Sequence, residues 1–159
     1  MQLPIINVAK LLPHSGEMVL LDEITHYDEN NLTAYANITE QHIFVQNQRL
    51  PMYIAIEIMA QGVAAWSGCH STDRGEPIKL GFLLGSRKYE LFCESLPINC
   101  KVQIKVESSL QDSNGFGVFN ATMHWISGEK PIDLPADHLL ARATLSVYSP
   151  NNLEDLPQK

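Results

Sequence analysis

The chain has 159 residues, of which 45% are hydrophobic, and a formal net charge of −7. This length fits one compact domain with its own core, which we place at residues 1–149, followed by a short polar tail at 150–159. The negative charge argues against a general nucleic-acid role, because phosphate binding needs concentrated Lys and Arg. The first ten residues lack the basic and then apolar pattern of a secretory signal, so we expect a cytoplasmic protein with no membrane partner.

Alternating apolar residues predict several β-strands. We expect a first strand at 18–25 and a second at 32–38, joined by the polar turn at 28–31. Four later segments show strand patterns, with turn residues such as Asn114-Gly115 between them: 78–92, 101–107, 117–126 and 141–148.

One segment predicts a long helix. Pro51 marks its start, and residues 52–69 run without a proline and are apolar almost all round. Such a helix is either buried on all sides or embedded in a membrane. This one is short for spanning a membrane and carries Glu57 and Gln61, so burial fits better. The sequence therefore predicts an α+β fold, with an antiparallel sheet wrapped around one central helix.

Glu57 is an unusual residue for a buried helix. Burying a carboxylate among aliphatic side chains is costly unless the group is paired or protonated. A carboxylic acid that keeps its proton near neutral pH can serve as a general acid, and Gln61, one turn away, could orient it. In the alternative interpretation, Glu57 leans out at the edge of the helix and pairs with a base.

A general acid in an elimination needs a base, and the chain has six histidines. None forms an H-x-H or H-x-x-x-H pair, so we expect no metal site. His42 lies fifteen residues before Glu57, in the connection to the helix, and is our candidate base, although a lone loop histidine is usually a surface residue. His14 lies in a turn and is left out of the catalytic pair. We expect three cysteines to be buried small hydrophobes: Cys69, Cys93 and Cys100.

Two motifs carry a family resemblance. Residues 11–14 (LLPH) and 18–22 (MVLLD) resemble the opening of the 3-hydroxyacyl-[acyl carrier protein] dehydratases. Residues 51–61 resemble their helix, with the proline, the glutamate and the final Met-Ala-Gln in register. Residues 61–68 and 81–85 (GFLLG) resemble a divergent branch of this family, found with aryl polyene and similar polyketide-type pathways.

The resemblance implies a hot-dog fold that pairs into a dimer with active sites at the subunit interface. His42 would remove the C2 proton of a 3-hydroxyacyl thioester, and Glu57 would protonate the departing hydroxyl to leave a 2-enoyl thioester. Backbone N–H groups around Met52 and Tyr53 would polarise the thioester carbonyl. No cofactor is implied. The chain departs from the family in lacking the glycines that follow the catalytic histidine and begin the helix.

Basic residues concentrate in one part of the chain. Six of the eleven lie between Arg74 and Lys105, against three glutamates. This segment is either a solvated sheet surface or a docking patch for an acidic partner. The resemblance implies an acyl carrier protein as that partner, meeting Arg87 and Lys88.

Three classes of function stay open. The first is a dehydratase, acting as a homodimer or as a heterodimer with another hot-dog subunit. The second is a hot-dog thioesterase, in which the helix carboxylate attacks or activates water without His42. The third is a non-catalytic subunit of a heterodimeric dehydratase, since fold alone does not decide function. Four residues are candidates for either the substrate channel or the core: Tyr53, Met59, Trp66 and Phe82.

Overall fold

A computed structural model describes residues 1–150, so the predicted tail lies outside the described residues apart from its first position. Its strands and its one α-helix follow the chain in this order: β1 (Glu23–Tyr27), β2 (Asn31–Ile38), β3 (Arg49–Pro51), α1 (Ala55–Asp73), β4 (Phe82–Leu91), β5 (Ser95–Pro97), β6 (Cys100–Gln111), β7 (Phe116–Gly128) and β8 (Leu139–Tyr148). Three short 3-10 helices are added: η1 (Val8–Leu11), η2 (Gly16–Met18) and η3 (Met52–Ile54).

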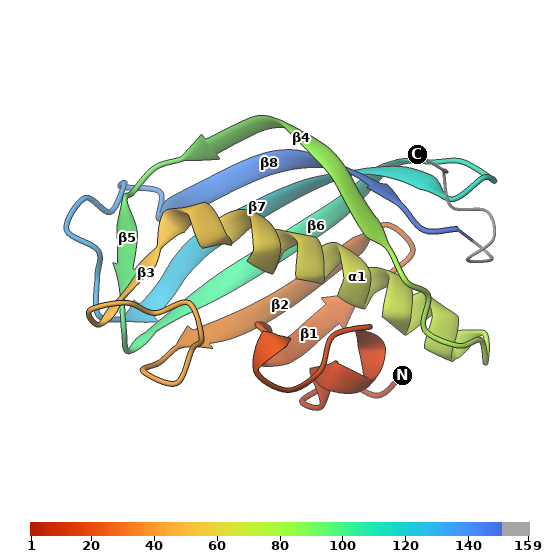
Figure 1. Ribbon diagram of the computed structural model, residues 1–159, viewed down its shortest axis with the longest axis horizontal. Coiled ribbons are helices and arrows are strands. Elements are labelled where there is room, and N and C mark those ends of the chain that lie inside the picture. The colour runs from red at the N-terminus through yellow and green to blue at the C-terminus, as the bar shows by residue number, and fades with distance from the viewer. Residues whose placement is uncertain (151–159) are drawn as a thin grey trace.

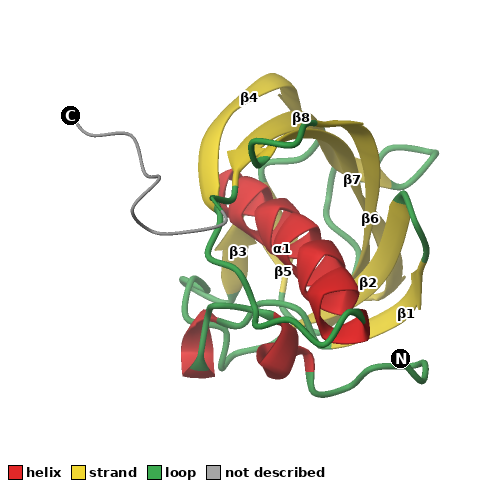
Figure 2. Ribbon diagram, turned by 90° about the vertical axis from the view of Figure 1, so that its right-hand side faces the viewer, coloured by secondary structure: helices red, strands yellow, loops and turns green. Residues whose placement is uncertain are grey.

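Six strands form one antiparallel sheet in the order β1-β2-β6-β7-β8-β4, and β3 pairs separately with β5. Helix α1 lies across the inner face of the sheet (Figure 1), and the sheet curls around it (Figure 2). The predicted α+β architecture is therefore confirmed.

Alternation along the strands creates the core between the sheet and α1. In β6, Val102, Ile104 and Val106 are buried on one face, while the residues between them are more exposed. Ile58 and Met59 of the helix are fully enclosed. Burying a large aliphatic side chain contributes about 1.5–3 kcal/mol, so this face of α1 holds the helix firmly in the sheet.

The predicted first strand is only partly a strand. Residues 18–22 end the 3-10 helix η2 and then run over α1 before β1 begins at Glu23. The backbone N–H of Leu20 donates to the side chain of Gln61 instead of to a neighbouring strand. The predicted strand is therefore observed only from Glu23 onward, and before it the buried residues Leu20 and Leu21 lie in a segment that Gln61 of α1 holds through the N–H of Leu20 and the carbonyl of Met18.

Helix α1 has one open face in the single chain, which corrects the prediction of burial on all sides. Glu57 is exposed and Ala60 and Ala64 are half-buried, and Tyr53 of the preceding η3 is 62% exposed. The sheet curls around the opposite side of the helix (Figure 2). Among residues 1–150, no helix has the length and apolar character needed to cross a membrane.

Strand β4 is an edge of the sheet and is exposed on both faces. Three consecutive apolar side chains lie on it, with Phe82 36%, Leu83 38% and Leu84 55% exposed. Long exposed apolar edges favour pairing with another strand. Within the described residues, this edge has no strand beside it other than β8.

Candidate active site

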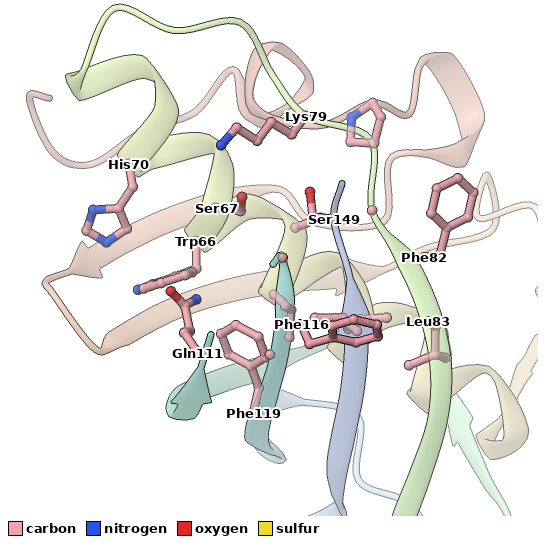
Figure 3. A pocket seen from close by; sticks show the side chains of 18 of the residues that line it. Trp66, Ser67, His70, Lys79, Phe82, Leu83, Gln111, Phe116, Phe119 and Ser149 are labelled. Carbon is pink, nitrogen blue, oxygen red and sulfur yellow. The ribbon is translucent and has the colours of Figure 1, made fainter. Parts of the chain in front are cut away.

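A groove of about 520 Å³ runs along the open face of α1. Glu57 lies among its lining residues, and Trp66, Ser67 and His70 line it further along the helix. Across from them lie aromatic and aliphatic side chains of β4 and β7 (Figure 3): Phe82, Leu83, Phe116 and Phe119. The groove therefore combines three carboxylates, those of Glu29, Glu57 and Asp112, with an apolar wall that can contact an acyl chain.

The four candidate channel residues differ in position, and Tyr53, at 62% exposed, belongs neither to the groove nor to the core. Trp66 and Phe82 line the groove. Met59 is completely enclosed and belongs to the core. The three cysteines are buried and unpaired as predicted, and burial raises the pKa of the Cys69 thiol to about 12.

Two backbone N–H groups at the start of the helix already donate hydrogen bonds within the chain. The N–H of Met52 donates to the carbonyl of Glu94 at 3.1 Å, so it is not available to polarise a substrate carbonyl. The N–H of Ile56 donates to the hydroxyl of Tyr89 on β4 at 3.2 Å. Of the two N–H groups predicted to polarise the substrate carbonyl, only that of Tyr53 remains a candidate.

Tyr89 ties the edge strand β4 to the start of α1. Its hydroxyl lies 3.4 Å from the carbonyl oxygens of Met52 and Tyr53, and burial raises its pKa. We expect Tyr89→Phe to lower the free energy of unfolding by about 0.5–1.5 kcal/mol, because the hydroxyl's hydrogen bonds are lost. Urea unfolding measures this loss. Tyr53→Phe, at an exposed ring, is the control, and equal losses in both variants would contradict the assignment.

Both ring nitrogens of His42 are closed off in the single chain. The N–H of Phe44 donates to Nδ1 at 3.3 Å, and Nε2 is enclosed without a hydrogen-bond partner. A neutral ring that accepts at Nδ1 carries its proton on Nε2. Burial lowers the pKa of His42, and the nearby carboxylate of Asp22 opposes this shift.

This lowered pKa predicts a pH-dependent stability. The unfolded chain, in which His42 has its ordinary pKa near 6.5, binds a proton that the folded chain resists. The free energy of unfolding should therefore fall as the pH drops from about 7 to about 5. We expect His42→Asn to flatten this slope. Burial also lowers the pKa of His124, so part of the slope should remain. An unaltered slope in His42→Asn, measured by urea unfolding across this range, would exclude the explanation.

Gln61 has a different role from the predicted one. Its side chain is 4% exposed, its Oε1 accepts from the N–H of Leu20 at 2.8 Å, and its Nε2 donates to the carbonyl of Met18. The amide therefore fastens the N-terminal segment onto α1 and does not orient Glu57.

The structure does not bring the two predicted catalytic residues to one cavity within a single chain. Glu57 lines the groove, whereas His42 is not among the lining residues. Two histidines share the groove with Glu57 and Gln61: His14, which is not part of the predicted catalytic pair, and His70, whose Nε2 is hydrogen-bonded to the carbonyl oxygen of Asp28 at 2.9 Å. The Leu-Leu-Pro-His motif of His14 was visible in the sequence, but its position over α1 follows from the tertiary fold.

Arg87 and Lys88 both lie exposed on β4. Within residues 1–150 neither has a carboxylate within ion-pair distance, whereas Arg74 pairs with Glu76 at 3.2 Å. Lys88 has a positive φ of 51°, at a bulge in the pairing of β4 with β8. Among the described residues, no three His, Cys, Asp or Glu side chains gather as a metal site would require.

The sheet, the central helix and the groove define a hot-dog protein, and comparisons with known proteins specify which kind. A family model for the ApeP-like dehydratases (ApeP dehydratase) matches residues 6–158, and the chain belongs to this family. A chain in the structure of the dehydratase heterocomplex ApeI:P from Xenorhabdus doucetiae is similar, with 28% identity and a TM-score of 0.81. The match covers 97% of this chain and 95% of that chain.

More distant structures share the fold alone. A hypothetical thioesterase with coenzyme A from Streptococcus pneumoniae is 10% identical, with a TM-score of 0.57 over 80% of this chain and 84% of that one. The E. coli PaaI protein is 11% identical, with a TM-score of 0.55 over 79% and 80% of the two chains. A comparison with curated protein sequences gives no match.

Proposed function

We propose that this protein is a subunit of a 3-hydroxyacyl-[acyl carrier protein] dehydratase, which eliminates water to form a 2-enoyl thioester in an aryl polyene or similar polyketide-type pathway. The match to the ApeP-like dehydratase family over residues 6–158 is the observation that carries this proposal. The groove supports it, because Glu57 lines a cavity whose wall also carries apolar side chains of β4 and β7 that can contact an acyl chain. A location in the cytoplasm stays a prediction from the sequence.

In the proposed reaction, His42 removes a proton from C2 of the substrate. The electron pair of that C–H bond forms the C2–C3 double bond, the C3–O bond breaks, and Glu57 protonates the departing hydroxyl to give water. His42 must present a lone pair at Nε2, so its proton has to move to Nδ1, where the N–H of Phe44 lies at 3.3 Å. The proposed base therefore needs a tautomer that the single chain does not favour.

We propose that a second hot-dog subunit covers the β4 edge and the open face of α1. Three observations support a partner there: the exposed apolar side chains of β4, its unpaired edge, and the exposure of Glu57. The similar structure from Xenorhabdus doucetiae is a heterocomplex, which favours a heterodimer over a homodimer. His42 and Glu57 would then act in sites completed by the partner subunit.

An acidic acyl carrier protein is the proposed donor of the substrate. Arg87 and Lys88 offer it two exposed cations without an acidic partner in the described chain. Electrostatic attraction of this kind mainly increases the rate of encounter, so it should weaken as salt increases.

Two alternatives remain testable beside the dehydratase. A thioesterase would use Glu57 to attack or activate water, and the thioesterase-like neighbours show that the fold can host such proteins. A non-catalytic subunit would support a partner that holds all the reacting groups. In favour of this alternative, one ring nitrogen of His42 is hydrogen-bonded to the N–H of Phe44 and the other is buried, so neither is placed to take a proton from a substrate in the single chain.

The test is to purify the chain alone and together with its hot-dog partner, and to give each a 3-hydroxyacyl-[acyl carrier protein]. We expect the enoyl product, followed by mass spectrometry of the carrier, from the complex. Free thiol without enoyl product would identify a thioesterase and exclude the dehydratase. Full activity of the complex after both His42→Ala and Glu57→Gln would identify this chain as the non-catalytic subunit.

A further inference from the structure

We propose that His14 is a substrate-binding residue whose Nε2 forms a hydrogen bond with the 3-hydroxyl group of the acyl chain beside Glu57. The inference rests on the proposed dehydratase function and assigns a second polar contact to the same site. The observation behind it is that His14 lines the groove together with Glu57 and Gln61.

Contacts with α1 before and after His14 in the chain fix the position of the segment that carries it. Before it, the carbonyl of Leu11 lies so close to Gly68 that a Cβ there would be 2.0 Å from the oxygen. After it, Gln61 binds the backbone of Met18 and Leu20. The segment between these contacts therefore runs along α1 toward the turn that contains Glu57, and it carries His14 on the wall of the groove.

The two nitrogens of the His14 ring have different surroundings. Nδ1 is enclosed and has no hydrogen-bond partner, whereas Nε2 stays accessible and has no partner among the described residues. Only Nε2 can therefore meet a ligand in the groove. In His42 the corresponding nitrogens are both closed, one by Phe44 and one by burial.

The 3-hydroxyl is the substrate group that this geometry favours. Glu57 and Gln61 are one helical turn apart, a rise of about 5.4–6 Å, and the contacts at Gly68 and Gln61 place the segment that carries His14 over the stretch of α1 that follows Glu57. A hydroxyl both donates and accepts, so it can bind Nε2 of His14 while it faces the carboxyl of Glu57. A hydrogen bond from each side would orient the leaving group before elimination.

Binding of two analogues to the assembled complex tests this contact apart from catalysis. One is a 3-hydroxyacyl chain carried as a stable amide, and the other is the same chain without the hydroxyl. Wild type should bind the hydroxylated analogue about tenfold more tightly. In His14→Ala this preference should fall to about twofold, with binding of the deoxy analogue unchanged, and His14→Gln should recover part of it.

The matched control is His124→Ala. His124 also has an enclosed, unpartnered Nδ1, but it lies on β7 and does not line the groove. A preference in His14→Ala and His14→Gln equal to wild type, in an active complex, would overturn the role of His14 and leave the dehydratase standing. A wild-type complex that forms no enoyl product and does not distinguish the analogues would overturn both. Equal losses in His124→Ala would show a general effect of removing a histidine and would also overturn the contact.

Discussion

Glu57→Gln should lower kcat of the assembled dehydratase by about 10²–10⁴-fold, the range typical for loss of a general acid. The amide keeps the size of the side chain but has no acidic proton to give to the departing hydroxyl. Glu57 is exposed in the single chain, so the substitution should leave the unfolding midpoint nearly unchanged. Steady-state formation of the enoyl product, measured on the complex with the same concentration of both subunits, gives the result.

Glu29→Gln is the matched control for this prediction. Glu29 is an exposed carboxylate that lines the same groove, and it precedes the strand β2. Removing its charge should change the local potential without removing the proposed acid. We expect its kcat to stay within about twofold of wild type, a difference of about 0.4 kcal/mol in the barrier. Similar losses in both variants would indicate an effect of groove charge and not of proton transfer at Glu57.

Gly68→Ala should destabilise the folded chain by about 1–3 kcal/mol, although alanine is the better helix former. The gain in helix propensity is about 1 kcal/mol. Against it, the new Cβ would lie 2.0 Å from the carbonyl oxygen of Leu11 and 2.9 Å from its carbonyl carbon. Backbone atoms cannot rotate away as the end of a side chain can, so the segment that contains the buried residues Val8 and Leu12 would have to move.

Gly85→Ala provides the comparison for this substitution. Gly85 lies on β4, and no atom would lie within 4 Å of its added Cβ. We expect its free energy of unfolding to stay within about 0.5 kcal/mol of wild type. Urea unfolding of both variants, with equal slopes, measures the difference. Equal stability of Gly68→Ala and Gly85→Ala would contradict the close contact between α1 and the N-terminal segment. If the contact holds, Gly68→Ala should also weaken substrate binding, since the same segment carries His14.

Local patterns in the sequence were most informative where one residue contacts neighbours on its own element. Alternation in β6 predicted which residues face the helix, and the run of apolar residues after Pro51 predicted α1. Patterns were less informative where one side chain takes hydrogen bonds from a distant segment. Gln61 holds residues 18 and 20, and nothing in the helix sequence distinguishes that role from orienting Glu57.

Two parts of the site illustrate the same limit. The N–H of Met52 looked free at the start of a helix, but it is used by Glu94, which lies more than forty residues later in the chain. The hydroxyl of Tyr89, on the edge strand β4, accepts a hydrogen bond from a second N–H near the start of the helix, that of Ile56. Both contacts depend on how strands pack against the helix, and long-range packing is not encoded in the spacing of nearby residues.

The sequence by itself determined the α+β fold, the long helix that carries Glu57, and the resemblance to dehydratases, because these depend on short-range periodicity and contiguous motifs. The tertiary structure decided that Glu57 lies on an open face of the helix and that His14 lines the groove. It also decided that the ring nitrogens of His42 are hydrogen-bonded to Phe44 or buried. The physical reason is that exposure and hydrogen-bond partners are properties of surfaces brought together by folding. The same residue types in the same order would allow either histidine to face the groove.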